Sequence, residues 1–72
     1  MVRIAGANDQ YDRIIDQHQL RAMVLYHPTH IARLEALGEF PRRIKLGRSR
    51  VGWSLFEVLL WLEARKAERD AK

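Results

Sequence analysis

The chain has 72 residues, no cysteine and a formal net charge of +4 at pH 7, with 47% hydrophobic and 31% charged residues. A chain of this length builds one small domain without room for a typical substrate pocket, and without cysteine it has no disulfide and no thiolate metal site. It contains neither an apolar run of roughly 18 residues nor a secretion signal, so we expect a soluble cytoplasmic protein without a membrane partner.

The positive charge is concentrated in the middle of the chain. Between residues 28 and 56 there are six basic and two acidic side chains, whereas the charges cancel over residues 1–27 and 57–72. A local excess of cations favours a nucleic-acid partner more than a high total charge does. The alternative is a solvated surface with an accidental bias, because such patterns are common on soluble domains.

Residues 1–12 show no sustained periodicity, and we interpret them as a flexible N-terminal arm ahead of a folded domain over residues 13–72. The domain begins with a short β-type run at 13–15. Asp16 and Gln19 then have the spacing of a capping box, which predicts a helix of about two turns. The residues of this helix that are spaced to face a core are Leu20, Met23 and Val24.

A turn at residues 25–27 precedes a second predicted helix, Pro28–Leu37. Pro28 suits the first helical position, because the N–H that proline lacks has no partner there. The buried stripe of this helix is predicted to contain Ile31, Leu34 and either Ala36 or Leu37, and its opposite side carries Thr29, His30 and Arg33.

A turn and a small β-hairpin are predicted over Gly38–Trp53. Gly38 suits the left-handed position that ends a helix, and Pro41 prevents helical continuation. Two short runs of β character, 44–46 and 51–53, flank the turn residues between them. The segment has no acidic residue after Phe40 and carries Arg42, Arg43, Lys45, Arg48 and Arg50. A basic hairpin after a helix is suited to contact with a phosphate backbone.

Ser54 and Glu57 have the spacing of a second capping box, and the helix that follows is predicted to continue to about Arg69. Its core-facing stripe contains Leu55, Val58, Trp61 and Leu62, while Phe56, Leu59 and Leu60 make the helix apolar nearly all round. A small domain cannot bury every face of such a helix. We interpret the extra apolar residues either as a contact surface for another subunit or partner, or as a wide core stripe with tolerated exposure.

The combined pattern resembles the AlpA family of small phage and mobile-element regulators, which is related to excisionases and MerR-type winged helix-turn-helix proteins. The resemblance covers about residues 14–65, and its matching positions are Gly38, Phe40, Pro41, Lys45, Leu46, Gly47, Val51, Trp53, Glu57, Val58 and Trp61. It implies an α+β, mostly α fold, in which a short N-terminal strand pairs with the β-hairpin wing. The chain departs from the family at Pro28 and Ala32, where relatives usually have arginine and an aromatic residue, so no target sequence can be carried over.

The resemblance implies a sequence-specific double-stranded DNA-binding protein, associated with the nucleoid, that acts as a transcriptional regulator, an excisionase (a recombination directionality factor) or both. The second helix is expected in a major groove and the wing on the neighbouring backbone or minor groove. The expected DNA contacts are Thr29, His30, Arg33, Arg42, Arg43, Lys45, Arg48, Ser49 and Arg50. Self-association through Phe56, Leu59 and Leu60 on adjacent DNA sites and an integrase partner are further expectations.

An alternative from another class is a protein-interaction adaptor, which uses the apolar C-terminal helix while the basic wing is incidental. We predict no enzyme activity, cofactor or metal site, because no serine has a His–Asp pairing and no glycine-rich phosphate loop is present. The three histidines have no cysteine to join them as a ligand, and the nearest acids, Asp16 and Glu35, lack ligand spacing. Trp53 and Trp61 are interpreted as packing residues and not as stacking platforms for single-stranded nucleic acid.

Overall fold

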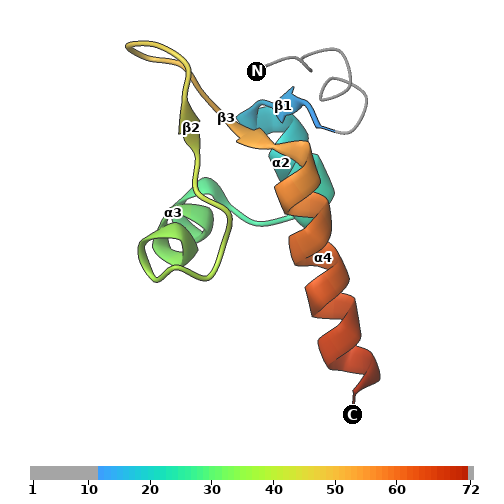
Figure 1. Ribbon diagram of the computed structural model, residues 1–72. Coiled ribbons are helices and arrows are strands. Elements are labelled where there is room, and N and C mark those ends of the chain that lie inside the picture. The colour runs from blue at the N-terminus through green and yellow to red at the C-terminus, as the bar shows by residue number, and fades with distance from the viewer. Residues whose placement is uncertain (1–11, 72) are drawn as a thin grey trace.

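The computed structural model describes residues 12–71, which form three helices and a three-stranded antiparallel sheet (Figure 1). The elements in chain order are β1 (Ile14–Ile15), α2 (Gln17–Val24), α3 (Pro28–Ala36), β2 (Ile44–Lys45), β3 (Val51–Ser54) and α4 (Leu55–Asp70). The predicted α+β winged helix-turn-helix fold is confirmed. Residues 1–11 of the expected N-terminal arm lie outside the described residues.

The sheet has the strand order β1-β3-β2, so the wing strand β3 is the central strand. β1 runs antiparallel to it with Ile15 opposite Trp53, and β2 pairs on the other side with Lys45 opposite Val51. The pairing extends beyond β2, where the Leu46 N–H donates to the Arg50 carbonyl at 2.8 Å. The expected hairpin, and the pairing of the N-terminal strand with it, are both present.

The first helix of the pair, α2, begins and ends with local signals. The Asp16 carboxylate accepts from the Gln19 N–H at 2.8 Å, and the Gln19 side chain accepts from the Asp16 N–H at 3.0 Å, which confirms the capping box. At the other end Leu25 takes the left-handed conformation with φ 64°, and its N–H donates to the Arg21 carbonyl. A large aliphatic residue is strained in this conformation, because its Cβ crowds the backbone.

The second helix, α3, is capped by a side chain that the sequence pattern did not predict. His27 precedes Pro28, and its Nδ1 accepts from the Thr29 N–H at 3.1 Å. At the C-terminal end Gly38 has φ 74°, as expected for a helix-ending glycine. The predicted third member of the buried stripe is wrong: both Ala36 and Leu37 are exposed, since the chain leaves the helix at this point.

The hydrophobic core takes at least one side chain from every long element and from the loop after α3. Trp53 and Val58, at 1% and 0% exposure, lie at its centre. The other buried apolar residues are Ile15, Leu20, Val24, Ile31 and Phe40, and the half-buried residues packed around them include Met23, Leu34, Leu55, Trp61 and Leu62. Because the two helices of the pair, the wing strand β3 and α4 all contribute side chains to this one core, they hold one another in place.

The N-terminus of α4 is fixed by residues from both ends of the domain. The Ser54 hydroxyl accepts from the Glu57 N–H at 3.1 Å, which is one half of the predicted capping box. The second partner is Asp12, not the Glu57 side chain: its carboxylate accepts from the Ser54 hydroxyl at 2.8 Å and from the Phe56 N–H at 3.0 Å. A negative carboxylate at this position also interacts favourably with the positive end of the α4 dipole. Asp12 therefore ties the start of β1 to α4.

Gly52 in β3 has no space for a side chain, because residues of the N-terminal strand lie too close to it. An added Cβ would overlap the Ile14 Cγ2 and lie 3.1 Å from the Ile15 carbonyl oxygen. We expect Gly52→Ala to lower the free energy of unfolding by about 1–3 kcal/mol, as overpacking does elsewhere, measured by urea denaturation.

Gly47→Ala is the matched control for this substitution. A Cβ at Gly47 meets nothing within 4 Å, so its stability should stay within about 0.5 kcal/mol of the wild type. Equal stability of the Gly52 and Gly47 variants would contradict the packing of Ile14 over β3.

Candidate nucleic-acid interface

The cationic middle segment of the chain forms two neighbouring elements, α3 and the β2–β3 hairpin. Figure 1 shows both on one side of the molecule, with the hairpin projecting beyond the body and the far end of α4 pointing away from it. The candidate interface therefore combines a short helix with an extended arm, and its residues come from positions 29–50.

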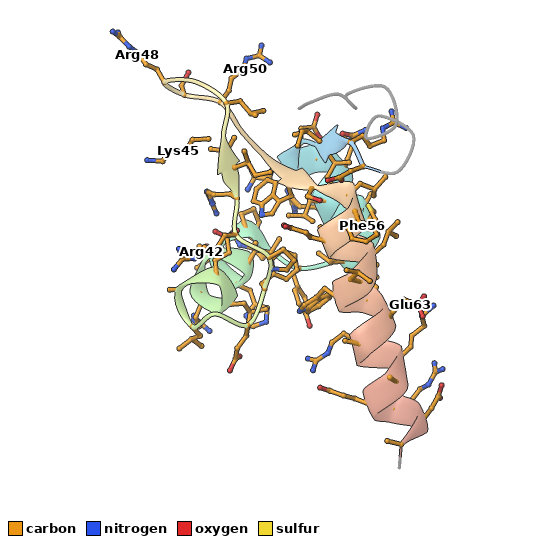
Figure 2. All side chains as sticks on the ribbon, viewed as in Figure 1. Arg42, Lys45, Arg48, Arg50, Phe56 and Glu63 are labelled. Carbon is orange, nitrogen blue, oxygen red and sulfur yellow. The ribbon has the colours of Figure 1, made fainter. Side chains whose placement is uncertain are left out.

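The wing carries its basic side chains on more than one side. In Figure 2, Lys45 and Arg42 point away from α4, Arg48 extends from the tip, and Arg50 lies on the other side of the hairpin from Lys45. This follows from the register, because Lys45 pairs with Val51 and neighbouring residues alternate between faces. All four side chains are exposed, as is Ser49 in the bend at the tip.

The exposed side of α3 presents the three residues expected there in different ways. Thr29 and Arg33 are exposed, whereas His30 is half-buried. The His30 ring packs edge-to-face against Tyr26, with ring centroids 4.6 Å apart and an interplanar angle of 86°. Tyr26 thus restricts the orientation of His30, while Arg33 is a long cationic side chain open to solvent.

Arg43 differs from the other cations because it already has partners within the protein. Its Nε donates to Glu35 Oε1 at 2.9 Å, and its guanidinium carbon lies 5.2 Å from the centre of the Trp53 ring. Glu35 also accepts from the indole N–H of Trp53 at 2.9 Å. The Glu35 side chain is only 12% exposed, so one carboxylate connects α3, the wing approach and the core. We call Glu35, Arg43 and Trp53 the carboxylate bridge.

The sequence reasoning did not identify Glu35 or His27 as important residues. Glu35 is one of only two acids in the basic segment, and this isolation was the one available signal. His27 could have been recognised as a helix cap only from its position directly before Pro28, because histidine is not among the common capping residues.

The loop between α3 and β2 is held by the second tryptophan. The indole N–H of Trp61 donates to the Glu39 carbonyl at 2.9 Å, and its ring contacts Phe40 edge-to-face at 4.9 Å. The interpretation of both tryptophans as packing residues is consistent with these contacts and with the 1% exposure of Trp53. Trp61 consequently fixes the approach to the wing, immediately before Arg42.

The three apolar residues expected on the outside of α4 are indeed exposed. Phe56, Leu59 and Leu60 have exposed fractions of 49%, 46% and 54%. Figure 2 shows Phe56 on α4, on the other side of the molecule from Lys45 and Arg42. Leu60 also lines a hollow beside the loop between α3 and β2, together with Phe40 and Pro41.

Residues 12–71 contain neither a metal-binding cluster nor a membrane-spanning helix. No group of three or more histidine, cysteine, aspartate or glutamate side chains in this range is arranged to hold a metal ion. The helices within it are also too short or too polar for any of them to cross a membrane.

The domain contains a helix pair joined by a three-residue turn, and a basic hairpin that pairs with the N-terminal strand and leads into a last helix. This arrangement defines a small winged helix-turn-helix domain. The family model described as prophage CP4-57 regulatory protein (AlpA) matches residues 13–66, which contain all of these elements except the end of α4. The chain belongs to this family. No curated protein matches the chain.

The adjacent residues Arg42 and Arg43 should respond differently to the same substitution. We expect Arg43→Gln to lower the free energy of unfolding by about 1–2 kcal/mol, because it leaves the mostly buried Glu35 without its cation. Arg42→Gln should leave stability within about 0.5 kcal/mol of the wild type, since Arg42 is exposed and it is Arg43 that pairs with Glu35.

The same two variants should show the reverse order in DNA binding, measured by fluorescence anisotropy across a salt series. Arg42→Gln should reduce the slope of log affinity against log salt by about 0.9, whereas Arg43→Gln should leave it unchanged. If both variants have the same stability and the same salt slope, the carboxylate bridge does not give Arg43 a role different from that of Arg42.

Proposed function

We propose that the protein binds double-stranded DNA sequence-specifically and acts in the nucleoid as a regulator of a phage or other mobile element. The observation that carries the proposal is the presentation of α3 and a cationic wing on one side of the fold, away from α4 (Figure 2). The description of the matching family as a regulatory protein supports a binding role and not an enzymatic one.

In this proposal α3 occupies a major groove, which at about 12 Å in width admits a helix. Thr29 and His30 lie near its N-terminal end, the part of a recognition helix that reaches base edges in helix-turn-helix proteins. Arg33, one turn further on, can donate two hydrogen bonds to a guanine or can hold a phosphate. Ala32 between them is small and allows close approach of the helix to the groove floor.

The wing is proposed to lie along the neighbouring minor groove or its backbone. Its cations lie on both faces of the hairpin, so Lys45 and Arg50 can each contact the phosphates of a different strand. Arg48 and Ser49 at the tip provide further phosphate donors, and Arg42 extends the cationic surface back to α3. The carboxylate bridge supports this arrangement, because it links α3 to the wing and fixes the angle between them.

The charge count sets the expected strength of binding. If Arg33, Arg42, Lys45, Arg48 and Arg50 each neutralise one phosphate, these five cations give a salt slope of about −4 to −5, so affinity falls several-hundredfold between about 50 and 200 mM salt. One domain alone makes few base contacts and should discriminate poorly between sequences. We therefore propose that several copies bind adjacent sites, with Phe56, Leu59 and Leu60 as the surface between them.

Two biological roles are compatible with this mode of binding. A transcriptional regulator needs only to overlap or adjoin a promoter. An excisionase needs to bend DNA and bind repeated sites cooperatively beside an integrase. The adaptor alternative, in which α4 binds another protein and the wing is incidental, is favoured by one observation only, the exposed apolar side chains of α4.

Removing the wing cations tests the DNA-binding proposal. We expect Arg48→Ala with Arg50→Ala to reduce affinity for generic duplex DNA at low salt by at least about tenfold, and the salt slope by about 1.8. Fluorescence anisotropy with labelled duplex measures both quantities. Unchanged affinity would remove the wing from the interface, and no binding of the wild-type protein at low salt would leave the adaptor as the better function.

Arg33→Ala then separates base reading from phosphate binding. If Arg33 reads a base, its loss lowers affinity for a selected site by about 1–3 kcal/mol more than for unrelated duplex. An equal loss on all sequences would assign Arg33 to a phosphate.

A charge placed on the apolar surface of α4 tests self-association. We expect Leu60→Glu to abolish cooperative binding to duplexes that carry two adjacent sites, while affinity for a single site stays unchanged. Ala67→Glu is the control, because it adds the same charge to an exposed position of the same helix outside the apolar surface. Non-cooperative binding by the wild type, or equal cooperativity in both variants, would remove the apolar surface from the proposal.

A further inference from the structure

A second cluster of nitrogen donors lies outside the interface described above. His18 and Arg21 of α2 and His27 at the start of α3 line one open hollow of about 610 Å³. All three side chains are exposed to solvent. The remaining lining residues are Ala22, Leu25 and Tyr26, so none of the described residues around the hollow is acidic. A concave site with basic and neutral donors and no carboxylate favours an anion.

The cap of α3 determines which nitrogen of His27 is available to a ligand. His27 Nδ1 accepts the Thr29 N–H at 3.1 Å, so in the neutral ring the proton is on Nε2. Nε2 lies at the opposite edge of the imidazole from the helix that the ring caps. His27 thus caps α3 with one nitrogen and offers an N–H to an external acceptor with the other.

The strained turn before α3 is what brings these donors together. Leu25 adopts its left-handed conformation at the end of α2, and its N–H closes on the Arg21 carbonyl. This tight reversal places His27 beside the last turns of α2, where it shares the hollow with Arg21 and His18. The positive end of the α3 dipole adds to the same side of the site.

We propose that this hollow binds a phosphate of the DNA backbone next to the major groove that α3 enters. The proposal rests on the proposed function and extends it. In a helix-turn-helix the first helix crosses the backbone while the second enters the groove, so a backbone strand passes where α2 and the start of α3 meet. The hollow lies at this junction and supplies the charged and neutral donors that a phosphodiester accepts from.

Arg21 also has a simpler role that the experiment must separate from phosphate binding. It lies in the last turn of α2, where any cation stabilises the helix dipole. Stability alone therefore does not test the proposal. The decisive measurement is the salt slope of DNA binding, which responds to the number of phosphates that the protein neutralises.

The test compares Arg21→Gln with Arg69→Gln in the full chain. Both substitutions remove one positive charge, and both keep a good helix former, so fold and net charge are matched. Arg69 lies in the last turn of α4, at the end that points away from α3 and the wing (Figure 1). Circular dichroism confirms that both variants fold, and anisotropy with generic duplex DNA across a salt series reports affinity and slope.

We expect Arg21→Gln to reduce the salt slope by about 0.9 and the affinity at low salt by about tenfold, equally on all sequences, whereas Arg69→Gln changes neither. His18→Ala should weaken binding less than Arg21→Gln does, because it removes a hydrogen-bonding side chain and not the fixed charge of an arginine. Equal slopes for the Arg21 and Arg69 variants, with wild-type binding intact, would overturn the assignment of the hollow and leave the wing mechanism standing. No binding by the wild type would overturn both.

A second arm separates DNA from free phosphate as the source of the anion. Inorganic phosphate is titrated into the protein at constant ionic strength, and the backbone amide signals of His18, Arg21 and His27 are followed by NMR. Generic duplex should shift these signals at a lower concentration than phosphate does. Saturable shifts with phosphate but none with DNA would assign the hollow to free phosphate and overturn the DNA assignment.

Discussion

The arrangement of this domain depends on the indole of Trp53. It lies on the central strand of the sheet opposite Ile15, is almost completely buried, and donates its N–H to Glu35 on α3. Arg43 covers its ring and shares the same carboxylate. One side chain thereby connects the sheet, the helix proposed to enter the groove and the approach to the wing. The contacts of Trp53 with Glu35 and Arg43 therefore help to set the angle between α3 and the wing.

The local signals in the sequence predicted most of the fold. Asp16 with Gln19, Pro28, Gly38 and Ser54 each mark a helix end, and each of these signals acts within four residues, so it can be read without tertiary information. The order of elements and the hairpin followed directly from these boundaries. The family resemblance added the pairing of the N-terminal strand with the wing, which no local pattern contains.

The features that were not predicted are contacts between residues far apart in the sequence. Asp12 caps a helix that begins more than forty residues later, and Glu35 reaches both Arg43 and Trp53. Such pairs exist only after the chain has closed around its core, and a sequence shows only that the charges are present. Leu25 is a different case, because leucine gives no signal for a left-handed turn. Among the candidate contacts, the basic residues could be identified from the sequence, but the ion pair that Arg43 forms with Glu35 could not.

Trp53 follows the first two helices in the chain, and this order has a consequence for folding during synthesis. β1 has no partner in the sheet until β3 follows it, and the core lacks its centre until residues 53 and 58 have been synthesised. The first two helices are consequently synthesised before the contacts that hold them exist, and the core can close only after residue 58 has been added. A chain that ends before Trp53 would therefore lack the centre of the core, and we expect it not to fold.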